Sequence, residues 1–237
     1  MILAAGLGKR LRPLTDTIPK PMVEVGGRPL LEQTLIQLSD LGLDRVVINV
    51  HHLAERIMDP IGDGSSLGVR VVWSKEDSLL DTGGGVCNAL PLLGHDPFLA
   101  VNGDVAWWMD LRPLIAAFDP DSMDALLGLV PAPGDPSETG KQFDFVLEDD
   151  LGRLRRAGKE TKGHVYSGIQ IMTPMALTPY PVLPFSLNRF YDDAMARGRL
   201  FGMPLVGFWA DIGTPERLTA ARGAWKNRFA FEKRVGI

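Results

Sequence analysis

Cysteine is almost absent from this sequence, and so is any large excess of charge. Cys87 is the one cysteine in 237 residues. No disulfide can therefore form within the chain, which favours a reducing compartment, and we expect the cytoplasm. The formal net charge is only −4, and this mild acidity argues against nucleic acid as a partner.

Long hydrophobic runs are missing too. The longest ones, such as Ala125–Pro133, are far shorter than the roughly 20 residues that a membrane-spanning helix needs, so we expect no membrane partner. Met1 leads directly into Ile-Leu-Ala-Ala-Gly with no basic segment, so we expect no secretion signal. The remaining composition, 45% hydrophobic and 23% charged, suits a globular chain with one sizeable core.

Short apolar runs alternate with longer amphipathic segments through the first half. The predicted strands there are Met1–Ala5, Arg45–Val50, Val69–Ser74 and Phe98–Val101, and the predicted helices are Pro29–Leu41, Leu53–Ile61, Thr82–Leu93 and Asp110–Phe118. The second half adds strands at Ala125–Val130, Phe143–Glu148 and Val165–Met172, and helices at Leu187–Arg197 and Pro215–Lys226. Repeated strand–helix–strand units predict a Rossmann-like α/β fold, with a mixed, mostly parallel sheet and helices on both faces. Residues 131–139 are predicted to be a loop that acts as a lid or hinge.

The segment Ala4–Pro21 carries the strongest chemical signal. Gly6 and Gly8 follow a strand, and glycines there let backbone N–H groups approach a phosphate closely. Four cations lie in the same segment: Lys9, Arg10, Arg12 and Lys20. This density of positive charge suits a triphosphate, although a glycine turn with a solvated basic surface is the structural alternative. The spacing fits neither the dinucleotide fingerprint nor the Walker A loop.

Two aspartates each follow an apolar run typical of a strand. Asp104 follows Phe98–Val101, and Asp211 follows Leu205–Ala210. Because strand ends can meet at one edge of an α/β sheet, we expect the two carboxylates to converge there. Mg²⁺ is usually bound by one or two carboxylates together with phosphate oxygens. The pair therefore predicts a magnesium site, with an ordinary Asn-Gly-Asp turn as the alternative for Asp104.

Together these segments resemble the sugar-1-phosphate nucleotidyltransferases. The resemblance rests on LAAGLGKRLRPLT, PKPMVEVGGRPLLE, DTGGG, VNGD and WADIGTP, which span residues 1 to about 222. It is greatest to the small, single-domain members that act on N-acetylmuramate 1-phosphate in cell-wall recycling. It implies the nucleotide-diphospho-sugar transferase type of fold. We expect one domain over residues 1–226, with a nucleotide-binding part to about 118, a sugar-binding part from about 119, and a tail at 227–237.

The resemblance also implies a reaction and a set of site residues. A nucleotidyl group would pass from an NTP, expected to be UTP, to a sugar 1-phosphate, expected to be N-acetylmuramate 1-phosphate, with release of pyrophosphate. Arg10 matches a residue that braces the pyrophosphate, Lys20 one that contacts the reacting phosphates, and Asp104 and Asp211 the carboxylates that hold Mg²⁺. The expected nucleotide-binding residues are Ala4, Ala5, Gly6, Gly8, Lys9, Arg10, Glu76, Thr82, Gly83 and Asn102. The expected sugar-binding residues are Asp144, Lys159, Ser167 and Gly168.

The residues leave three alternatives open. The first is a mannose- or glucose-1-phosphate nucleotidyltransferase that uses GTP, UTP or dTTP. The second is a choline-phosphate cytidylyltransferase, with an aromatic cage formed by Trp107, Trp108, Tyr166 and Trp209. The third is a non-catalytic regulatory subunit. Such a subunit would be expected to lack one of the two phosphate-contacting cations or one of the two aspartates, whereas all four are present.

Overall fold

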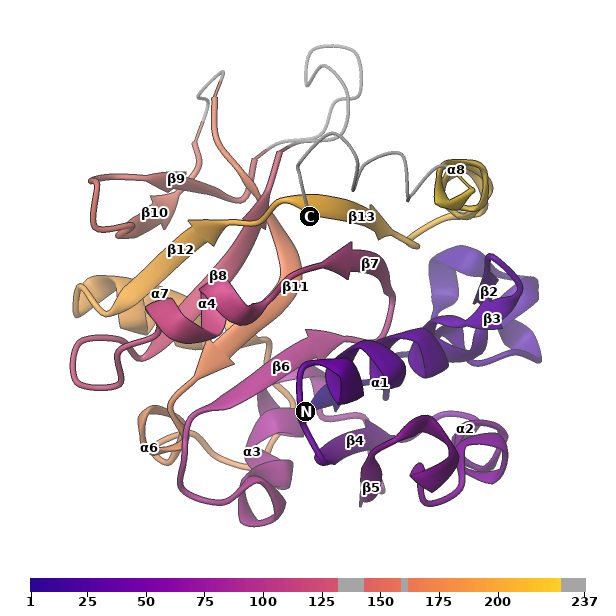
Figure 1. Cartoon of the computed structure of the whole chain (residues 1–237). Helices are drawn as coiled ribbons and strands as arrows, with labels where there is room; N and C mark the ends of the chain where they lie inside the picture. The colour runs from indigo at the N-terminus through magenta and orange to yellow at the C-terminus, as the bar shows by residue number, and fades with distance from the viewer. Residues whose placement is uncertain (132–142, 159–161, 227–237) are drawn as a thin grey trace.

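A seven-stranded sheet runs through the molecule (Figure 1). The computed structural model describes residues 1–131, 143–158 and 162–226. The strand order is β12-β8-β11-β6-β1-β4-β5. The strands are β1 (Ile2–Leu3), β4 (Arg45–Val50), β5 (Arg70–Lys75), β6 (Phe98–Asn102), β8 (Ala125–Val130), β11 (Val165–Met172) and β12 (Leu200–Pro204). Neighbouring strands are parallel except where β11 pairs with β6 and β8, which confirms the predicted mixed, mostly parallel sheet.

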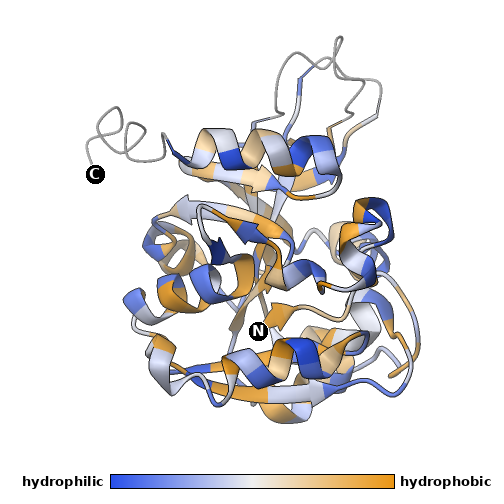
Figure 2. Ribbon diagram, turned by 90° about the vertical axis from the view of Figure 1, so that its right-hand side faces the viewer, coloured by the Kyte–Doolittle hydropathy of each residue, from blue (hydrophilic) through white to orange (hydrophobic). Residues whose placement is uncertain are grey.

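Helices cover both faces of this sheet, as predicted. They are α1 (Leu30–Asp40), α2 (Ala54–Ile61), α3 (Asp81–Leu93), α4 (Arg112–Ala117), α6 (Pro174–Leu177) and α7 (Leu187–Ala196), whereas α8 (Pro215–Trp225) lies outside the sheet. Side chains of α1, α2 and α4 pack on one face, and side chains of α3, α6 and α7 pack on the other. Successive strand residues alternate between the two cores, so that Val46 and Ile48 face the first and Val47 faces the second. Figure 2 shows hydrophilic and hydrophobic residues side by side along the helices, as expected of helices that each bury one face.

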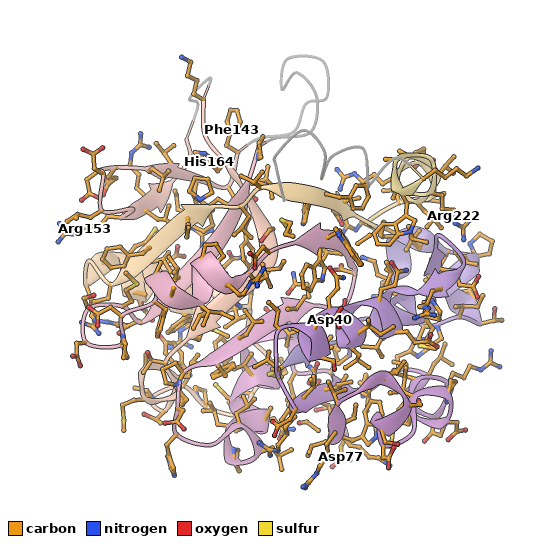
Figure 3. All side chains as sticks on the ribbon, in the orientation of Figure 1. Asp40, Asp77, Phe143, Arg153, His164 and Arg222 are labelled. Carbon is orange, nitrogen blue, oxygen red and sulfur yellow. The ribbon has the colours of Figure 1, made fainter. Side chains whose placement is uncertain are left out.

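A third core lies outside the main sheet. There, α8 packs on a ribbon of β7 (Val105–Met109) and β13 (Gly207–Asp211) and on a hairpin of β2 (Glu24–Val25) and β3 (Arg28–Pro29). Leu11, Ile212 and Trp225 are among its buried residues. Arg222 on α8 donates a hydrogen bond to the Glu24 carbonyl over 3.0 Å and lies between α8 and the hairpin in Figure 3. This core therefore joins the glycine-rich loop to a helix from the other end of the described chain.

The strands β7, β10 (Leu154–Arg156) and β12 were not predicted, and β9 is shorter than expected, at Phe145–Leu147. These strands are short and have no clear alternation of polar and apolar residues. The helix predicted from Asp110 begins at Arg112, whose N–H donates to the Asp110 carboxylate over 3.0 Å. Within the described ranges, no helix has both the length and the apolar character needed to cross a membrane. Lys159, the tail at 227–237 and all of the predicted lid except Pro131 lie outside the described residues.

Candidate active site

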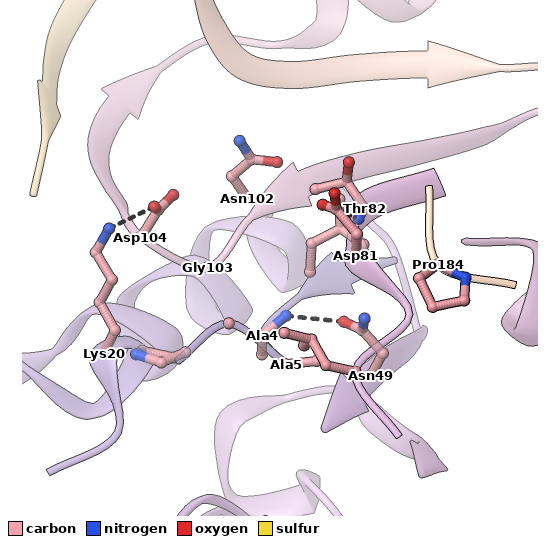
Figure 4. A pocket seen from close by; sticks show the side chains of 14 residues that line it. Ala4, Ala5, Lys20, Asn49, Asp81, Thr82, Asn102, Gly103, Asp104 and Pro184 are labelled. Carbon is pink, nitrogen blue, oxygen red and sulfur yellow. Dashed lines mark hydrogen bonds and ion pairs between the residues drawn. The ribbon is translucent and has the colours of Figure 1, made fainter. Parts of the chain in front are cut away.

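A pocket of about 370 Å³ opens at the carboxyl ends of β1 and β6 (Figure 4). This position is where open α/β sheets bind ligands, and the volume suits a small molecule. The lining residues are Leu3, Ala4, Ala5, Gly6, Lys20, Pro21, Asn49, Leu79, Asp81, Thr82, Asn102, Gly103, Asp104 and Pro184. The structure therefore brings together these predicted site residues: Ala4, Ala5, Gly6, Lys20, Thr82, Asn102 and Asp104.

The glycine-rich loop is held in shape by Thr15. Gly8 has a φ of 62°, and a Cβ built on it would lie 3.0 Å from the Thr15 methyl group, so glycine is favoured there. The buried Thr15 hydroxyl donates to the Gly8 carbonyl over 2.8 Å. Lys9 and Arg10 follow in a short 3-10 helix, η1 (Lys9–Leu11), and are exposed. Neither forms an ion pair with a carboxylate of the described residues, so both can approach an anion.

Lys20 and Asp104 form an ion pair at the edge of the pocket. Lys20 Nζ lies 2.6 Å from Asp104 Oδ2, as the dashed line in Figure 4 marks. The Lys20 side chain is 11% exposed and that of Asp104 is 33% exposed. Asp104 stands in the turn between β6 and β7, where the Gly103 N–H donates to the Leu3 carbonyl over 2.8 Å. This hydrogen bond fixes the turn against β1, the strand that precedes the glycine-rich loop.

Asp211 comes to Asp104 by a different route from the one predicted. Its strand β13 does not belong to the seven-stranded sheet; it pairs with β7, and Asp211 stands opposite Val105. The Ile212 N–H donates to the Asp104 carbonyl over 3.0 Å. The two aspartates are therefore neighbours, but an antiparallel ribbon, and not a shared edge of the main sheet, brings them together. Asp211 is not among the residues that line the pocket of Figure 4.

Arg217 is a site residue that the sequence analysis missed. Its guanidinium donates to Asp211 Oδ2. A Cβ built on Gly213 would lie 3.2 Å from the Asp211 carboxylate and from Arg217 Nη1, so the turn fits closely around the pair. Thr214 caps α8, and Pro215 opens it. The sequence does contain a signal for this arginine. Thr214 and Pro215 mark the start of a helix just after the candidate metal ligand Asp211, so a side chain in the first helical turn is expected to lie near it.

The glycines at 83–85 serve the protein's own packing. The Gly83 N–H donates to the Phe185 carbonyl over 2.8 Å. A Cβ built on Gly83 would lie 2.3 Å from the Phe185 ring, and one on Gly84 would lie 2.2 Å from the Leu183 carbonyl oxygen. The structure thus places Gly83 against residues 183–185 and outside the pocket lining, and its contact with the nucleotide stays a prediction. That segment in turn contributes Pro184 to the pocket wall.

Glu76, the candidate for contact with the nucleotide, has buried hydrogen-bond partners of its own. The sequence analysis expected it in the nucleotide site, but its side chain is buried behind the pocket wall and does not line the pocket. One carboxylate oxygen accepts from Asn49 Nδ2 over 2.7 Å, and the other accepts from the Leu80 N–H over 3.0 Å. Thr82 does line the pocket, and its hydroxyl accepts from the Leu187 N–H over 2.9 Å.

The predicted sugar-binding residues are placed differently from one another. Gly168 lies against the pocket residue Asn102, at 3.0 Å between a built Cβ and the Asn102 Cβ. The Ser167 hydroxyl is fully buried and donates to the Gly128 carbonyl over 2.7 Å, so it is used inside the sheet. Asp144 is exposed, and its Oδ2 accepts from the Tyr166 N–H over 2.9 Å.

The Tyr166 phenol stays protonated. Its pKa is raised well above the ordinary value, mainly by burial and to a smaller extent by the neighbouring Tyr191 and Asp104.

The aromatic residues do not form the cage required by the choline-phosphate alternative. Trp107 is 1% exposed and belongs to the first core. Trp108 packs edge-on against Trp225 at 6.3 Å between ring centres. Trp209 Nε1 donates to the Ser167 carbonyl over 2.7 Å. The tryptophan rings predicted to form a cage are therefore largely part of the packing around the site.

Comparison with known proteins adds independent findings. Residues 1–140 match the family described as nucleotidyl transferase. The chain is 38% identical over 236 residues to the N-acetylmuramate alpha-1-phosphate uridylyltransferase of Neisseria meningitidis serogroup B, covering 95% of this chain and 99% of that protein. It is 35% identical over 228 residues to the protein of the same name from Caulobacter vibrioides, covering 93% and 94%. A solved structure described as a putative glucose-1-phosphate thymidylyltransferase from Bacillus anthracis shares the fold, with a TM-score of 0.80, 21% identity and coverage of 94% and 92%. The glycine-rich loop, the pocket above it and these similarities agree: this chain belongs to the nucleotidyl transferase family.

Proposed function

We propose that this chain transfers a uridylyl group from UTP to N-acetylmuramate 1-phosphate, releasing pyrophosphate and forming a UDP-sugar. The observation that carries the reaction class is the Lys20–Asp104 pair at the edge of a pocket lined by the glycine-rich loop. The two full-length relatives of that name support the substrates. We further propose, from the resemblance of the sequence motifs, that the reaction recycles cell-wall sugars in the cytoplasm.

The geometry suits a reaction driven by positioning and charge. An oxygen of the sugar phosphate attacks the α-phosphorus of UTP, and the bond from that phosphorus to the pyrophosphate oxygen breaks. Arg10 and Lys9 stand exposed beside the glycine-rich loop, where they can contact the β- and γ-phosphates as charge develops on the leaving group. Lys20 is already at the pocket and contacts the reacting phosphates. No thiolate takes part, because burial raises the pKa of the Cys87 thiol to about 11.

We propose that Asp104 and Asp211 hold Mg²⁺ with the substrate phosphates. No cluster of three or more His, Cys, Asp or Glu side chains suited to a metal occurs within the described ranges. Two carboxylates are nevertheless a suitable protein contribution for Mg²⁺, which takes its other ligands from water and phosphate oxygens. When bound, the ion neutralises phosphate charge. Each carboxylate accepts a hydrogen bond from a cationic side chain here, Lys20 or Arg217, which orients it.

A pyrophosphate-release assay tests this proposal. Each of the four common ribonucleoside triphosphates is combined with N-acetylmuramate 1-phosphate, N-acetylglucosamine 1-phosphate, mannose 1-phosphate or phosphocholine. We expect the highest kcat/KM for UTP with N-acetylmuramate 1-phosphate. Faster turnover of GTP with mannose 1-phosphate would overturn the substrates and keep the reaction class. Absence of pyrophosphate release with every pair would favour the non-catalytic subunit.

Replacing Arg217 should weaken metal binding. Groups that hydrogen-bond to a metal ligand orient it, and their loss costs about 10- to 100-fold in metal affinity or activity. We therefore expect Arg217→Ala to raise the Mg²⁺ concentration for half-maximal rate by about tenfold or more. Binding of Mn²⁺ to the UTP complex, followed by electron paramagnetic resonance, gives a second readout. Arg222→Ala on the same helix, which removes only the bond to the Glu24 carbonyl, should leave both unchanged. An unchanged or stronger metal affinity in Arg217→Ala would show that the arginine does not orient Asp211.

A further inference from the structure

A buried chain of three hydrogen bonds runs through the wall of the pocket, where Ala4 and Asn49 are lining residues. The Ala4 N–H donates to Asn49 Oδ1 over 2.8 Å, as Figure 4 marks. Asn49 Nδ2 donates to Glu76 Oε1 over 2.7 Å, and the Leu80 N–H donates to Glu76 Oε2 over 3.0 Å. Asn49 is 2% exposed and Glu76 is 6% exposed. We call these four residues, Ala4, Asn49, Glu76 and Leu80, the wall relay.

The wall relay connects two walls of the pocket that are far apart in sequence. Ala4 lies in the pocket lining at the start of the glycine-rich loop. Leu80 stands between Leu79 and Asp81, which both line the opposite side. Asn49 belongs to β4 and Glu76 directly follows β5, so two strands of the main sheet carry the side chains in between. Two buried side chains therefore link the backbones of the two walls.

The hydrogen-bond donors at the two ends determine which side chains can form the relay. Both ends are backbone N–H groups, which can only donate. Asn49 can accept at one end and donate at the other, so Glu76 must accept on both of its oxygens. A glutamine or a protonated glutamic acid would set one donor against another, and turning the Asn49 amide around would move the same conflict to Ala4. The relay therefore requires a side chain at position 76 that accepts on both of its oxygens.

The third glycine of the DTGGG segment makes room for this arrangement. A Cβ built on Gly85 would lie 2.7 Å from Asn49 Nδ2 and 2.7 Å from Glu76 Oε1. Among the described residues, Glu76 has no ion-pair partner, so hydrogen bonds stabilise its charge. Burying a carboxylate is costly unless its oxygens are hydrogen-bonded, as both oxygens of Glu76 are.

We propose that Glu76 and Asn49 are positioning residues that set the width of the nucleotide pocket. This inference rests on the proposed function, because it assumes that the pocket binds the nucleotide. The relay holds the backbone on the two sides of the nucleotide and does not contact the sugar phosphate. Its loss should therefore weaken nucleotide binding and leave the KM for the sugar phosphate nearly unchanged.

A reciprocal exchange of the two side chains tests the relay. Glu76→Gln places a donor against a donor, and Asn49→Asp places two carboxylates against each other. In the double variant, the new carboxylate at position 49 would accept from the Ala4 N–H and from the new amide at position 76, whose oxygen would accept from the Leu80 N–H. All three bonds are then restored, with the same total charge. We expect each single variant to raise the nucleotide Kd and KM by about tenfold or more, and the double variant to return within about threefold of wild type.

Binding is measured by calorimetry with the nucleotide that the wild type prefers, and thermal unfolding of each variant is recorded. Asn88→Asp serves as a control, because Asn88 lies on α3 and donates to Ser74 Oγ over 3.1 Å outside the pocket. An affinity unchanged in Glu76→Gln would overturn the relay. A double variant as weak as Glu76→Gln would also overturn it, because Glu76 would then act on the nucleotide directly. A wild type that releases no pyrophosphate with any substrate pair would instead contradict the proposed function.

Discussion

Asp104→Asn and Asp211→Asn should each lower kcat by about a thousandfold or more, since a charge on a metal-holding carboxylate contributes several kcal/mol to transition-state stabilisation. Asparagine matches aspartate in size, and both positions are only partly buried, so the fold should persist. The rate is measured as pyrophosphate release at saturating Mg²⁺ and UTP. Circular dichroism and thermal unfolding check that the variants are folded.

Asp110→Asn is the matched control. This aspartate comes directly after β7, and it also pairs with an arginine, Arg112, at 2.8 Å. It does not line the pocket of Figure 4, so its replacement should leave kcat close to wild type. A near-normal kcat for either Asp104→Asn or Asp211→Asn would exclude that residue as a metal ligand.

Gly84→Ala should destabilise the protein by about 1–3 kcal/mol, the usual cost of overfilling a packed site. The added methyl group would lie 2.2 Å from the Leu183 carbonyl oxygen, a backbone atom that cannot turn aside. Displacing residues 183–185 would also move Pro184 in the pocket wall, so the KM for UTP should rise. Urea unfolding gives the free energy, and initial rates give the KM.

Gly223→Ala is expected to have the opposite effect on the free energy of unfolding. Gly223 is exposed on α8, and a Cβ built there meets nothing within 4 Å. Alanine should therefore stabilise the helix by roughly 0.5–1 kcal/mol. If Gly84→Ala were as stable as wild type, the segment at 183–185 would not be seated on α3 as the structure shows.

Local patterns in the sequence predict the framework of this fold well. The strands Arg45–Val50, Ala125–Val130 and Val165–Met172 have the predicted bounds, because runs of β-branched and apolar residues report burial on both faces of a sheet. The glycine-rich loop and the Asn-Gly-Asp turn are also local, since their residues are close in sequence. The pocket therefore opens at the segments that the motifs indicated.

The partners of buried groups could not be predicted in this way. A glycine in the sequence indicates a close approach but does not say what approaches, and the group next to Gly83 is the Phe185 ring. A carboxylate such as Glu76 is chemically suited to contact a base. Its bonds to Asn49 and Leu80, however, depend on the order of the strands in the sheet. Likewise, the place of Asp211 is decided by the pairing of β13 with β7, and the sequence analysis had not predicted β7.

The third core has a consequence for synthesis of the protein on the ribosome. Trp225 lies over Gly26, where a built Cβ would come within 2.1 Å of the indole ring, and Leu11 and Ile212 are buried in the same cluster. The glycine-rich loop leaves the exit tunnel early, but the helix that covers its flank emerges only after the sheet has been made. A nascent chain can thus complete most of its sheet while the phosphate-binding segment still lacks its cover. The glycine-rich loop therefore gains the cover on its flank only when α8 docks.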